Sequence, residues 1–253
     1  MIAISVQSGS NGNCIYVEAG GAKLLFDAGI SGLQAQRRLE KHGRDIHKVD
    51  MVIISHDHSD HVRCAGVYHR KFGLPVYMTK ATHETVRRQN LGKVEVTHFV
   101  SGQNIQIRDA VIETFRTPHD AADGVVFVVR DGKHSLGVLT DLGHVFAELP
   151  DIIADLDAVF IESNYDPDML ANGPYPFYLQ QRISGMHGHL SNFEAADLLK
   201  TAASPKIRWA CLSHLSENNN TPALAMETHR GCLSKSFPLH IASRHDAGEI
   251  LTL

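Results

Sequence analysis

The chain has 253 residues, of which 43% are hydrophobic and 21% charged, a composition typical of a globular protein with a sizeable core. Its formal net charge of −4 excludes a broad positive field that would attract nucleic acid along the whole surface. No stretch has the order of a signal peptide or the length of a membrane span, which predicts a cytoplasmic protein with no membrane partner. The four cysteines are scattered without a Cys-x-x-Cys pair, so neither a disulfide framework nor a thiolate zinc site is predicted.

Apolar patterning predicts short strands through most of the chain, interrupted by a few helices. The predicted strands cover 2–6, 14–19, 23–27, 51–54, 74–78, 94–100, 105–107, 111–115, 125–129, 135–139, 159–162, 207–212 and 239–242. The first three are expected to form a β-meander, and the last to begin a closing hairpin. The predicted helices cover 31–43, 62–72, 80–90, 193–200 and 223–233. Residues 166–188 are rich in Pro and Gly, which predicts a loop-rich lid in which 178–183 could be helical. No linker, repeat or low-complexity stretch divides the chain, so residues 1–253 are expected to form one domain.

The segment that follows the apolar run 51–54 concentrates metal-binding side chains. It reads His56-Asp57-His58-Ser59-Asp60-His61, so five of six consecutive residues can bind a metal. In extended geometry His56 and His58 point the same way. Asp60 and His61 can reach a second position nearby, while Asp57 and Ser59 are expected to face away. Imidazoles and a carboxylate this close repel or desolvate one another unless a cation holds them. A polar loop with chance histidines is the alternative, but the position after a buried strand favours a metal site.

Other residues of metal-binding type also follow predicted strands directly. They are His119, Asp141, Glu162 and His214. If these strand ends converge on one edge, a single site can draw residues from across the sequence. A lone His is usually structural, whereas a Glu that ends an apolar strand is costly unless it has a partner. The segment 8–13, rich in Gly, Ser and Asn, predicts either a simple turn or a backbone nest whose N–H groups face a phosphate.

The pattern His-x-His-x-Asp-His at 56–61 resembles the signature of the metallo-β-lactamase superfamily, and the resemblance extends over the whole chain. Within that superfamily the sequence is most similar to the WalJ/YycJ-type hydrolases, which are related to tRNA 3′-processing nucleases and cyclic-phosphate phosphodiesterases. The resemblance implies an α/β fold, namely a four-layer αββα sandwich in which two mixed β-sheets are flanked by helices.

The resemblance also implies a site for two divalent metal ions. One ion would be held by His56, His58, His119 and Asp141, and the other by Asp60, His61, His214 and the same Asp141. Nitrogen and carboxylate ligands without sulfur suit Zn²⁺ or Mn²⁺, with Fe as a further option. Two cations about 3.5–4 Å apart would hold a bridging water and lower its pKa towards ~7, which supplies a hydroxide. Asp27 matches a superfamily carboxylate that orients ligands without touching the metal.

The same resemblance implies a general acid. The tRNA-processing relatives pair a Glu at a strand end with a later His, and the matching positions here are Glu162 and His189. A His supported by a carboxylate can stay protonated and donate to a leaving oxygen, a step worth ~10²–10⁴-fold. The alternative is that His189 only caps the next helix, and His187 competes with it for the acid role. Asp60 is counted with this pair among the predicted catalytic residues.

Candidate substrate contacts are Ser10 and Asn13 in the 8–13 loop, together with Arg182; Arg244 is a further cation that could meet a phosphate. The resemblance implies a phosphodiesterase acting on nucleic acid, with DNA favoured, as a 5′→3′ exonuclease. A small cyclic or short phosphodiester is the alternative substrate, which the acidic net charge tolerates better. A third hypothesis is a non-hydrolytic metal-binding interaction protein, and the complete ligand set argues against it. The oligomeric state is left open, with a homodimer as one option.

Overall fold

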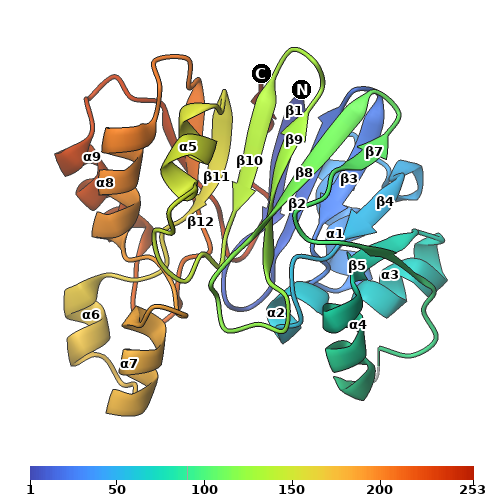
Figure 1. Ribbon diagram of the computed structural model, residues 1–253, viewed down its shortest axis with the longest axis horizontal. Coiled ribbons are helices and arrows are strands. Elements are labelled where there is room, and N and C mark those ends of the chain that lie inside the picture. The colour runs from blue at the N-terminus through green and yellow to red at the C-terminus, as the bar shows by residue number, and fades with distance from the viewer. Residues whose placement is uncertain (90) are drawn as a thin grey trace.

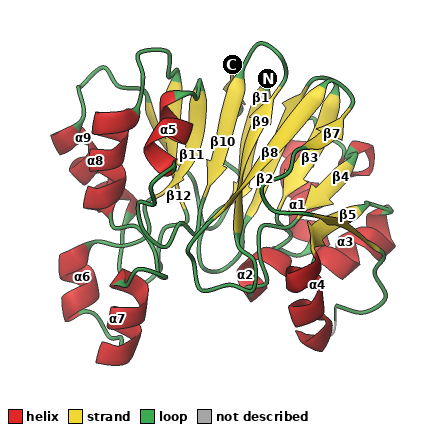
Figure 2. Ribbon diagram, in the orientation of Figure 1, coloured by secondary structure: helices red, strands yellow, loops and turns green. Residues whose placement is uncertain are grey.

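Two β-sheets lie at the centre of the molecule (Figure 1, Figure 2). The computed structural model describes residues 1–89 and 91–253. The first sheet contains β1 (Ile2–Gln7), β2 (Cys14–Ala19), β3 (Ala22–Phe26), β4 (Met51–Ile53), β5 (Val76–Thr79), β6 (Val96–Phe99) and β14 (Leu251–Thr252). The second contains β7 (Ile105–Ile107), β8 (Ala110–Arg116), β9 (Val125–Arg130), β10 (Ser135–Leu139), β11 (Ala158–Glu162), β12 (Trp209–Ser213) and β13 (Leu239–Ile241). Their strand orders are β14-β1-β2-β3-β4-β5-β6 and β13-β12-β11-β10-β9-β8-β7.

Helices flank the outer faces of the two sheets, and a few lie beyond the lower ends of the strands (Figure 2). They are α1 (Gly32–Lys41), α2 (Ser59–Val62), α3 (Ala65–Phe72), α4 (Lys80–Val86), α5 (Leu149–Ala154), α6 (Pro167–Asn172), α7 (Phe177–Ser184), α8 (Asn192–Ala202) and α9 (Pro222–Cys232), with 3₁₀ turns at Ile46–Lys48 and Arg87–Gln89. Among the described residues, none of these helices combines the length and apolar character needed to cross a membrane.

Three layers of buried apolar side chains hold the fold together. The central layer joins the two sheets, where the rings of Phe26 and Phe127 lie 5.1 Å apart. A second layer packs Tyr68 of α3 against the first sheet, and a third packs Leu199 of α8 against the second. Each fully buried side chain of this size contributes about 1.5–3 kcal/mol. The predicted four-layer αββα sandwich with two mixed sheets is confirmed.

Several parallel strands of both sheets end at the same edge of the molecule. The opening β1-β2-β3 meander is antiparallel as predicted, whereas β3 to β6 run parallel in the first sheet. In the second sheet β10 to β13 also run parallel. The carboxyl ends of these parallel strands open on the lower side of Figure 1, where α2 follows β4 directly. Crevices outside the carboxyl ends of parallel strands are the usual position for binding sites in α/β sheets.

The helix considered at 178–183 is confirmed as α7, but the rest of residues 166–188 is less loop-rich than predicted, because it contains a second helix, α6. α6 starts at Pro167 and is capped by the Asp166 side chain, which accepts the Met169 N–H at 2.9 Å. α7 starts directly after Pro176. Pro is well tolerated at a helix start, where its missing N–H would be unpaired in any case. Proline residues that favoured a loop in the sequence therefore mark the beginnings of helices.

The predicted helix 62–72 begins later than expected, at Ala65 of α3, and Val62 is instead the last residue of the separate short helix α2. The Cys64 N–H donates to Ala28 O at 2.9 Å, outside the helix. The carbonyl of Asp60, which would continue the helical ladder to Cys64, instead accepts the Asn13 N–H at 2.8 Å. Contacts from the first three strands thus interrupt the helix at this point. The predicted helix 80–90 ends at Val86 and continues as a 3₁₀ turn, and position 90 lies outside the described residues.

The predicted C-terminal hairpin does not form. β13 pairs parallel with β12 in the second sheet, whereas β14 pairs antiparallel with β1 in the first. The segment between them crosses from one sheet to the other, and its Gly248 N–H donates to Ser5 O at 2.9 Å. Both terminal strands therefore find partners that are remote in sequence.

Buried His229 on α9 gives the fold a specific acid sensitivity. Its Nδ1 donates to Ala225 O at 2.9 Å, and burial lowers its pKa to about 4. Below pH 6.5 the unfolded chain binds a proton that the folded chain excludes, so stability falls as the pH drops from 6.5 to 4. We expect this residue to account for about 3 kcal/mol of that loss.

The measurement is urea unfolding of the metal-free chain at pH 7 and at pH 4. His229→Leu, which keeps the volume and removes the titrating group, should lose about 3 kcal/mol less between the two pH values than the wild type. Exposed His245→Leu is the control and should follow the wild type. Equal pH sensitivity of His229→Leu and the wild type would contradict the assignment.

Candidate metal centre and active site

A cavity of about 290 Å³ opens at the edge where the parallel strands end. Its lining contains Ser10, His58, Ser59, Asp60, Asp120, Asp141, Arg182, Ile183, Gly188, His189 and His214. Ser59, which was expected to face away from the metal ligands, is also part of this lining. Asp57 lies outside the lining and accepts the Ala122 N–H at 2.9 Å. The cavity brings together most of the residues that the sequence singles out.

The strand ends deliver these residues from both sheets. Asp141 follows β10 by two residues, Glu162 is the last residue of β11, and His214 directly follows β12. β11 and β12 are in parallel register with Glu162 opposite Ser213, so their ends are level. β4 ends at Ile53, and His58 is the N-cap of α2, which begins at Ser59. His58 keeps an extended backbone beyond the end of β4, and the rings of His56 and His58 lie 4.6 Å apart, as expected for side chains that point the same way.

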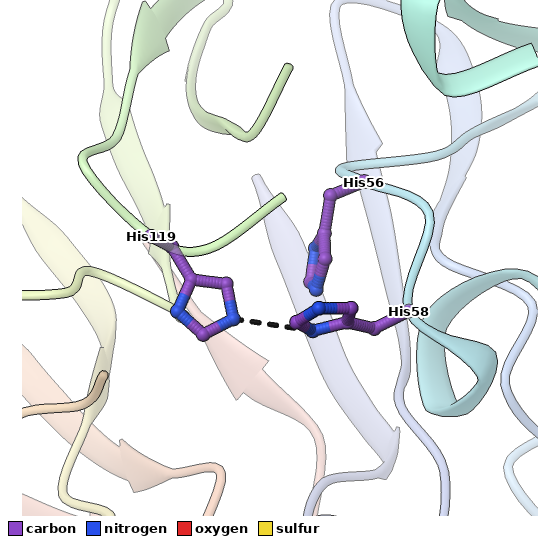
Figure 3. A group of neighbouring side chains, drawn as sticks. All are labelled: His56, His58 and His119. Atoms are coloured by element: carbon purple, nitrogen blue, oxygen red, sulfur yellow. Dashed lines mark hydrogen bonds between the residues drawn. The ribbon is translucent and has the colours of Figure 1, made fainter. Parts of the chain in front are cut away.

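His56, His58 and His119 form a cluster whose ring nitrogens lie within 4.8 Å of one another (Figure 3). His58 Nε2 donates to Asp120 O at 3.1 Å, and His119 Nδ1 donates to Gly188 O at 2.7 Å. With those tautomers, His58 Nδ1 and His119 Nε2 both present lone pairs, yet they face each other at 3.2 Å along the dashed line of Figure 3. Two lone pairs so arranged are explained by a cation between them.

Asp141 stands at the centre of a second group of side chains. Its Oδ2 lies 3.2 Å from His61 Nε2, and its Oδ1 lies 3.3 Å from His214 Nε2 and 3.6 Å from His119 Nε2. Asp60 Oδ2 lies 3.4 Å from His61 Nε2. Ligand atoms about 2.1 Å from a tetrahedral metal lie about 3.4 Å from one another, which matches this spacing.

Two buried atoms of this group also lack ordinary partners. Within the described residues, His56 Nε2 and Asp141 Oδ2 make no hydrogen bond. A buried unpaired acceptor costs about 1–3 kcal/mol, so such atoms are rare unless something else binds them. Nitrogen and carboxylate donors without sulfur form a set that divalent cations prefer. The residues present therefore fit a divalent metal.

Neighbouring side chains fix the orientation of these candidate ligands. Asp27 Oδ2 accepts from His61 Nδ1 at 2.7 Å, and its Oδ1 accepts the Ser55 N–H at 2.8 Å. Asn13 is buried, and its side chain contacts His61 Nε2 at 3.0 Å and His214 Nδ1 at 3.1 Å. The contacts of Asp27 with His61 Nδ1 and of Asn13 Oδ1 with His214 Nδ1 leave Nε2 of both rings facing the centre. They fit an orienting role for Asn13 better than contact with a substrate.

Glycine at position 29 allows this arrangement to close. A Cβ at Gly29 would lie 1.6 Å from Asp60 O, so a side chain cannot be accommodated where β3 approaches α2. Hydrogen bonds from Gly29 N to Asn13 O and from Ala28 N to His61 O hold these segments together. The loop after β1, the end of β3 and α2 thus form one rigid support.

The buried carboxylates and imidazoles of the cluster shift one another's pKa values. Burial alone would raise the pKa of Asp141, but the surrounding histidines, His214 and His61 foremost, hold it well below its usual range. Burial lowers the pKa of His61, yet the carboxylates of Asp141 and Asp27 outweigh it and raise that pKa well above the ordinary value. Burial holds the pKa of His56 well below the ordinary value, which leaves a neutral imidazole of the kind that binds metals.

His189 and Glu162 are paired as predicted. His189 Nδ1 donates to Glu162 Oε1 at 2.5 Å, and Glu162 Oε2 accepts the N–H groups of Leu142 at 3.0 Å and Leu190 at 3.2 Å. Burial lowers the pKa of His189, but the charge and hydrogen bond of Glu162 raise it to about 9. His187, the competitor, instead donates from Nδ1 to Pro118 O. Only His189 of the two lines the cavity.

Three residues of the cluster have strained backbones. Asp27, Asp141 and His214 have φ angles of 65°, 59° and 56°, in the left-handed region that L-residues rarely adopt. Each lies at the end of a strand, where the turned backbone directs the side chain toward the centre. Such strain costs about 1–2 kcal/mol per residue and is concentrated at functional sites.

The predicted phosphate contacts lie in different places. Ser10 and Arg182 line the cavity, and Arg182 Nε donates to Asp120 Oδ2 at 2.6 Å. Arg244 lies outside the lining, in a neighbouring cavity of about 370 Å³, where its Nη2 lies 2.9 Å from Glu217 Oε2. Asp120 was missed by the sequence analysis, although its carboxylate lies 3.5 Å from His119 Nε2. Its position directly after His119 was the only available signal.

Comparison with known proteins gives consistent results. The family profile described as "Beta-lactamase superfamily domain" matches residues 22–215. The exodeoxyribonuclease WalJ of Streptococcus pneumoniae is 35% identical over 225 residues, which cover 87% of this chain and 84% of that protein. The exodeoxyribonuclease YycJ of Bacillus anthracis is 33% identical over 220 residues, covering 86% and 83%. Among solved structures, the metallo-β-lactamase fold protein YhfI of Bacillus subtilis aligns with a TM-score of 0.76 at 18% identity, covering 98% of this chain and all of that one.

Proposed function

Because the chain belongs to the β-lactamase superfamily, we propose that it is a metal-dependent phosphodiesterase that degrades DNA from an end, in the 5′→3′ direction. The names of its curated relatives, both exodeoxyribonucleases, support the DNA substrate and the attack on an end. The observation that carries the proposal is the central position of Asp141, whose two oxygens face histidines of both groups within one cavity. A single carboxylate placed in this way can serve two cations at once.

The residues present would hold two cations. His56, His58, His119 and Asp141 would bind one, and Asp60, His61, His214 and Asp141 the other. Zn²⁺ and Mn²⁺ suit these donors. When bound, such cations polarise a phosphoryl oxygen and lower the pKa of a water molecule enough to supply a nucleophile near neutral pH. Asp27 keeps the Nδ1 proton of His61 in place, so Nε2 is the ligand atom.

The protein itself supplies an acid and a phosphate contact. His189 faces the cavity and is held by Glu162 through Nδ1, so its Nε2–H can protonate the departing oxygen of the cleaved ester. Glu162 is fixed by two backbone N–H groups and acts as the positioning residue for that imidazole. Arg182 and Ser10 lie at the cavity wall, where they would contact the phosphate.

The direct test uses end-labelled DNA, single- and double-stranded, with a 5′-phosphate or a 5′-hydroxyl, incubated with Mn²⁺ or Zn²⁺. We expect mononucleotides to be released progressively from the 5′ end. If DNA is untouched while an aryl phosphodiester is cleaved, a small phosphodiester becomes the substrate class, in keeping with the acidic net charge. If the metal-loaded protein cleaves neither, the phosphodiesterase proposal is wrong.

A further inference from the structure

Helix α7 presents two bulky aromatic side chains to solvent beside the cavity. Phe177 and Tyr178 are 71% and 73% exposed, and they are adjacent in the first turn of the helix. Single exposed apolar residues are ordinary, but neighbouring exposed rings at the margin of a polar cavity indicate a binding surface. Figure 1 shows α7 projecting from the edge where the strands end, away from both sheets.

Tyr178 and Arg182 lie on one side of α7. Positions four residues apart are neighbours on a helix surface, one turn along the axis. Arg182 and the following Ile183 line the cavity, so this side of the helix leads from Tyr178 directly to the candidate active site. The Asp120 carboxylate uses the Nε donor of Arg182, and a guanidinium has four further N–H donors for a phosphate.

We propose that Tyr178 stacks on an unpaired base of a DNA strand whose phosphate binds Arg182, which makes this side of α7 a single-strand platform. The inference rests on the proposed nuclease function and specifies the form of its substrate. Four residues advance about 6 Å along a helix axis, which exceeds the ~3.4 Å rise per nucleotide of a duplex strand. The pair therefore fits a nucleotide that has left the base stack.

The acidic character of the chain favours this mode of binding. A net charge of −4 limits the affinity that phosphate contacts can provide. Stacking of a base on an aromatic ring tolerates any base and needs no charge on the protein, and loss of the ring weakens binding roughly tenfold. One contact from Arg182 to a phosphate, combined with stacking on Tyr178, would thus bind the end of a DNA strand without a positively charged groove.

The test is fluorescence anisotropy of a labelled strand with phosphorothioate linkages, bound by the full-length, metal-loaded protein. Tyr178→Ala should weaken binding about tenfold, whereas Tyr178→Phe, which keeps a ring, should bind like the wild type. Exposed Phe193 on α8 offers a matched control, and Phe193→Ala should leave affinity unchanged. With one or two phosphates engaged, log K should fall with log salt at a slope of about −0.7 to −1.4.

A strand of abasic nucleotides provides the decisive comparison. The wild type should bind it about tenfold more weakly than a thymidine strand, and Tyr178→Ala should bind both equally, because the ring and the base are partners in one contact. Equal losses on both strands in Tyr178→Ala, equal binding by Tyr178→Ala and the wild type, or no binding of single strands at all would each overturn the platform.

Cleavage assays separate this inference from the nuclease proposal. Tyr178→Ala should hydrolyse a small aryl phosphodiester with the wild-type kcat, since Tyr178 lies outside the cavity lining where the ester would be cleaved. If strands bind through Tyr178 but are never cleaved, the platform stands and the nuclease proposal fails. If strands are cleaved and Tyr178→Ala binds them normally, the nuclease stands and the platform is wrong.

Discussion

Asp141→Asn should remove phosphodiesterase activity and at least one bound metal ion while the fold survives. Residues that only orient a metal ligand cost about 10–100-fold when mutated, so a carboxylate shared by two cations should cost more than about 100-fold. The amide keeps the shape of the side chain but loses the negative charge that faces the nitrogens of His61, His119 and His214. The measurements are steady-state hydrolysis, elemental analysis of metal content and circular dichroism.

Asp57→Asn is the matched control, since Asp57 lies in the same segment and its side chain accepts a backbone N–H outside the cavity. It should retain the wild-type metal content and rate. Chelation of the wild type should reproduce the loss of activity seen in Asp141→Asn, and added Mn²⁺ or Zn²⁺ should reverse only the chelated sample. Full activity in Asp141→Asn would refute the bridging role.

His189→Ala should lower kcat by ~10²–10⁴ with no change in metal content. The loss should be largest for DNA, whose alkoxide leaving group needs a proton, and small for an aryl ester whose phenolate leaves without one. The alkaline limb of the wild-type pH profile should disappear in the variant, because that limb reports loss of the acid's proton. Added imidazole should restore part of the activity if the missing group is a proton donor.

His187→Ala serves as the comparison, because the two histidines are separated by one residue and only His189 lines the cavity. It should retain most of the activity on both substrates. A fall in metal content in His189→Ala would make His189 a ligand, an arrangement that its proximity to Asp141, Glu162 and His214 also permits geometrically. A uniform loss on DNA and aryl ester alike would exclude the acid role.

The sequence predicts the strands well because buried runs such as Val125–Arg130 carry their signal locally. It predicts the layered architecture only through a family resemblance, which the family profile and the solved fold confirm. Its errors occur where distant contacts decide. Helix α3 begins later than predicted because the Cys64 N–H donates a hydrogen bond to Ala28 O. Strand β14 pairs with β1 instead of forming the expected hairpin with β13. Neither partner can be identified from the few residues around it.

The candidate site follows the same rule. His119 and His214 could be nominated from their positions at strand ends, and the structure brings both to one centre. Two supports of that centre, Ser55 and Asp120, could not be predicted, since they carry no motif and act only through their neighbours in space, whereas Asp27 and Glu162 were predicted through the family resemblance.

The left-handed backbones of Asp27, Asp141 and His214 have a consequence for protein engineering. Glycine at such positions relaxes the main chain, so a selection for heat resistance alone would tend to accept it there. Such variants would unfold less readily, but glycine in place of Asp141 or His214 would remove a proposed metal ligand, and glycine in place of Asp27 would remove the side chain that orients His61. Selection schemes for this protein should therefore measure catalysis in every round, because these residues with strained backbones belong to the candidate active site.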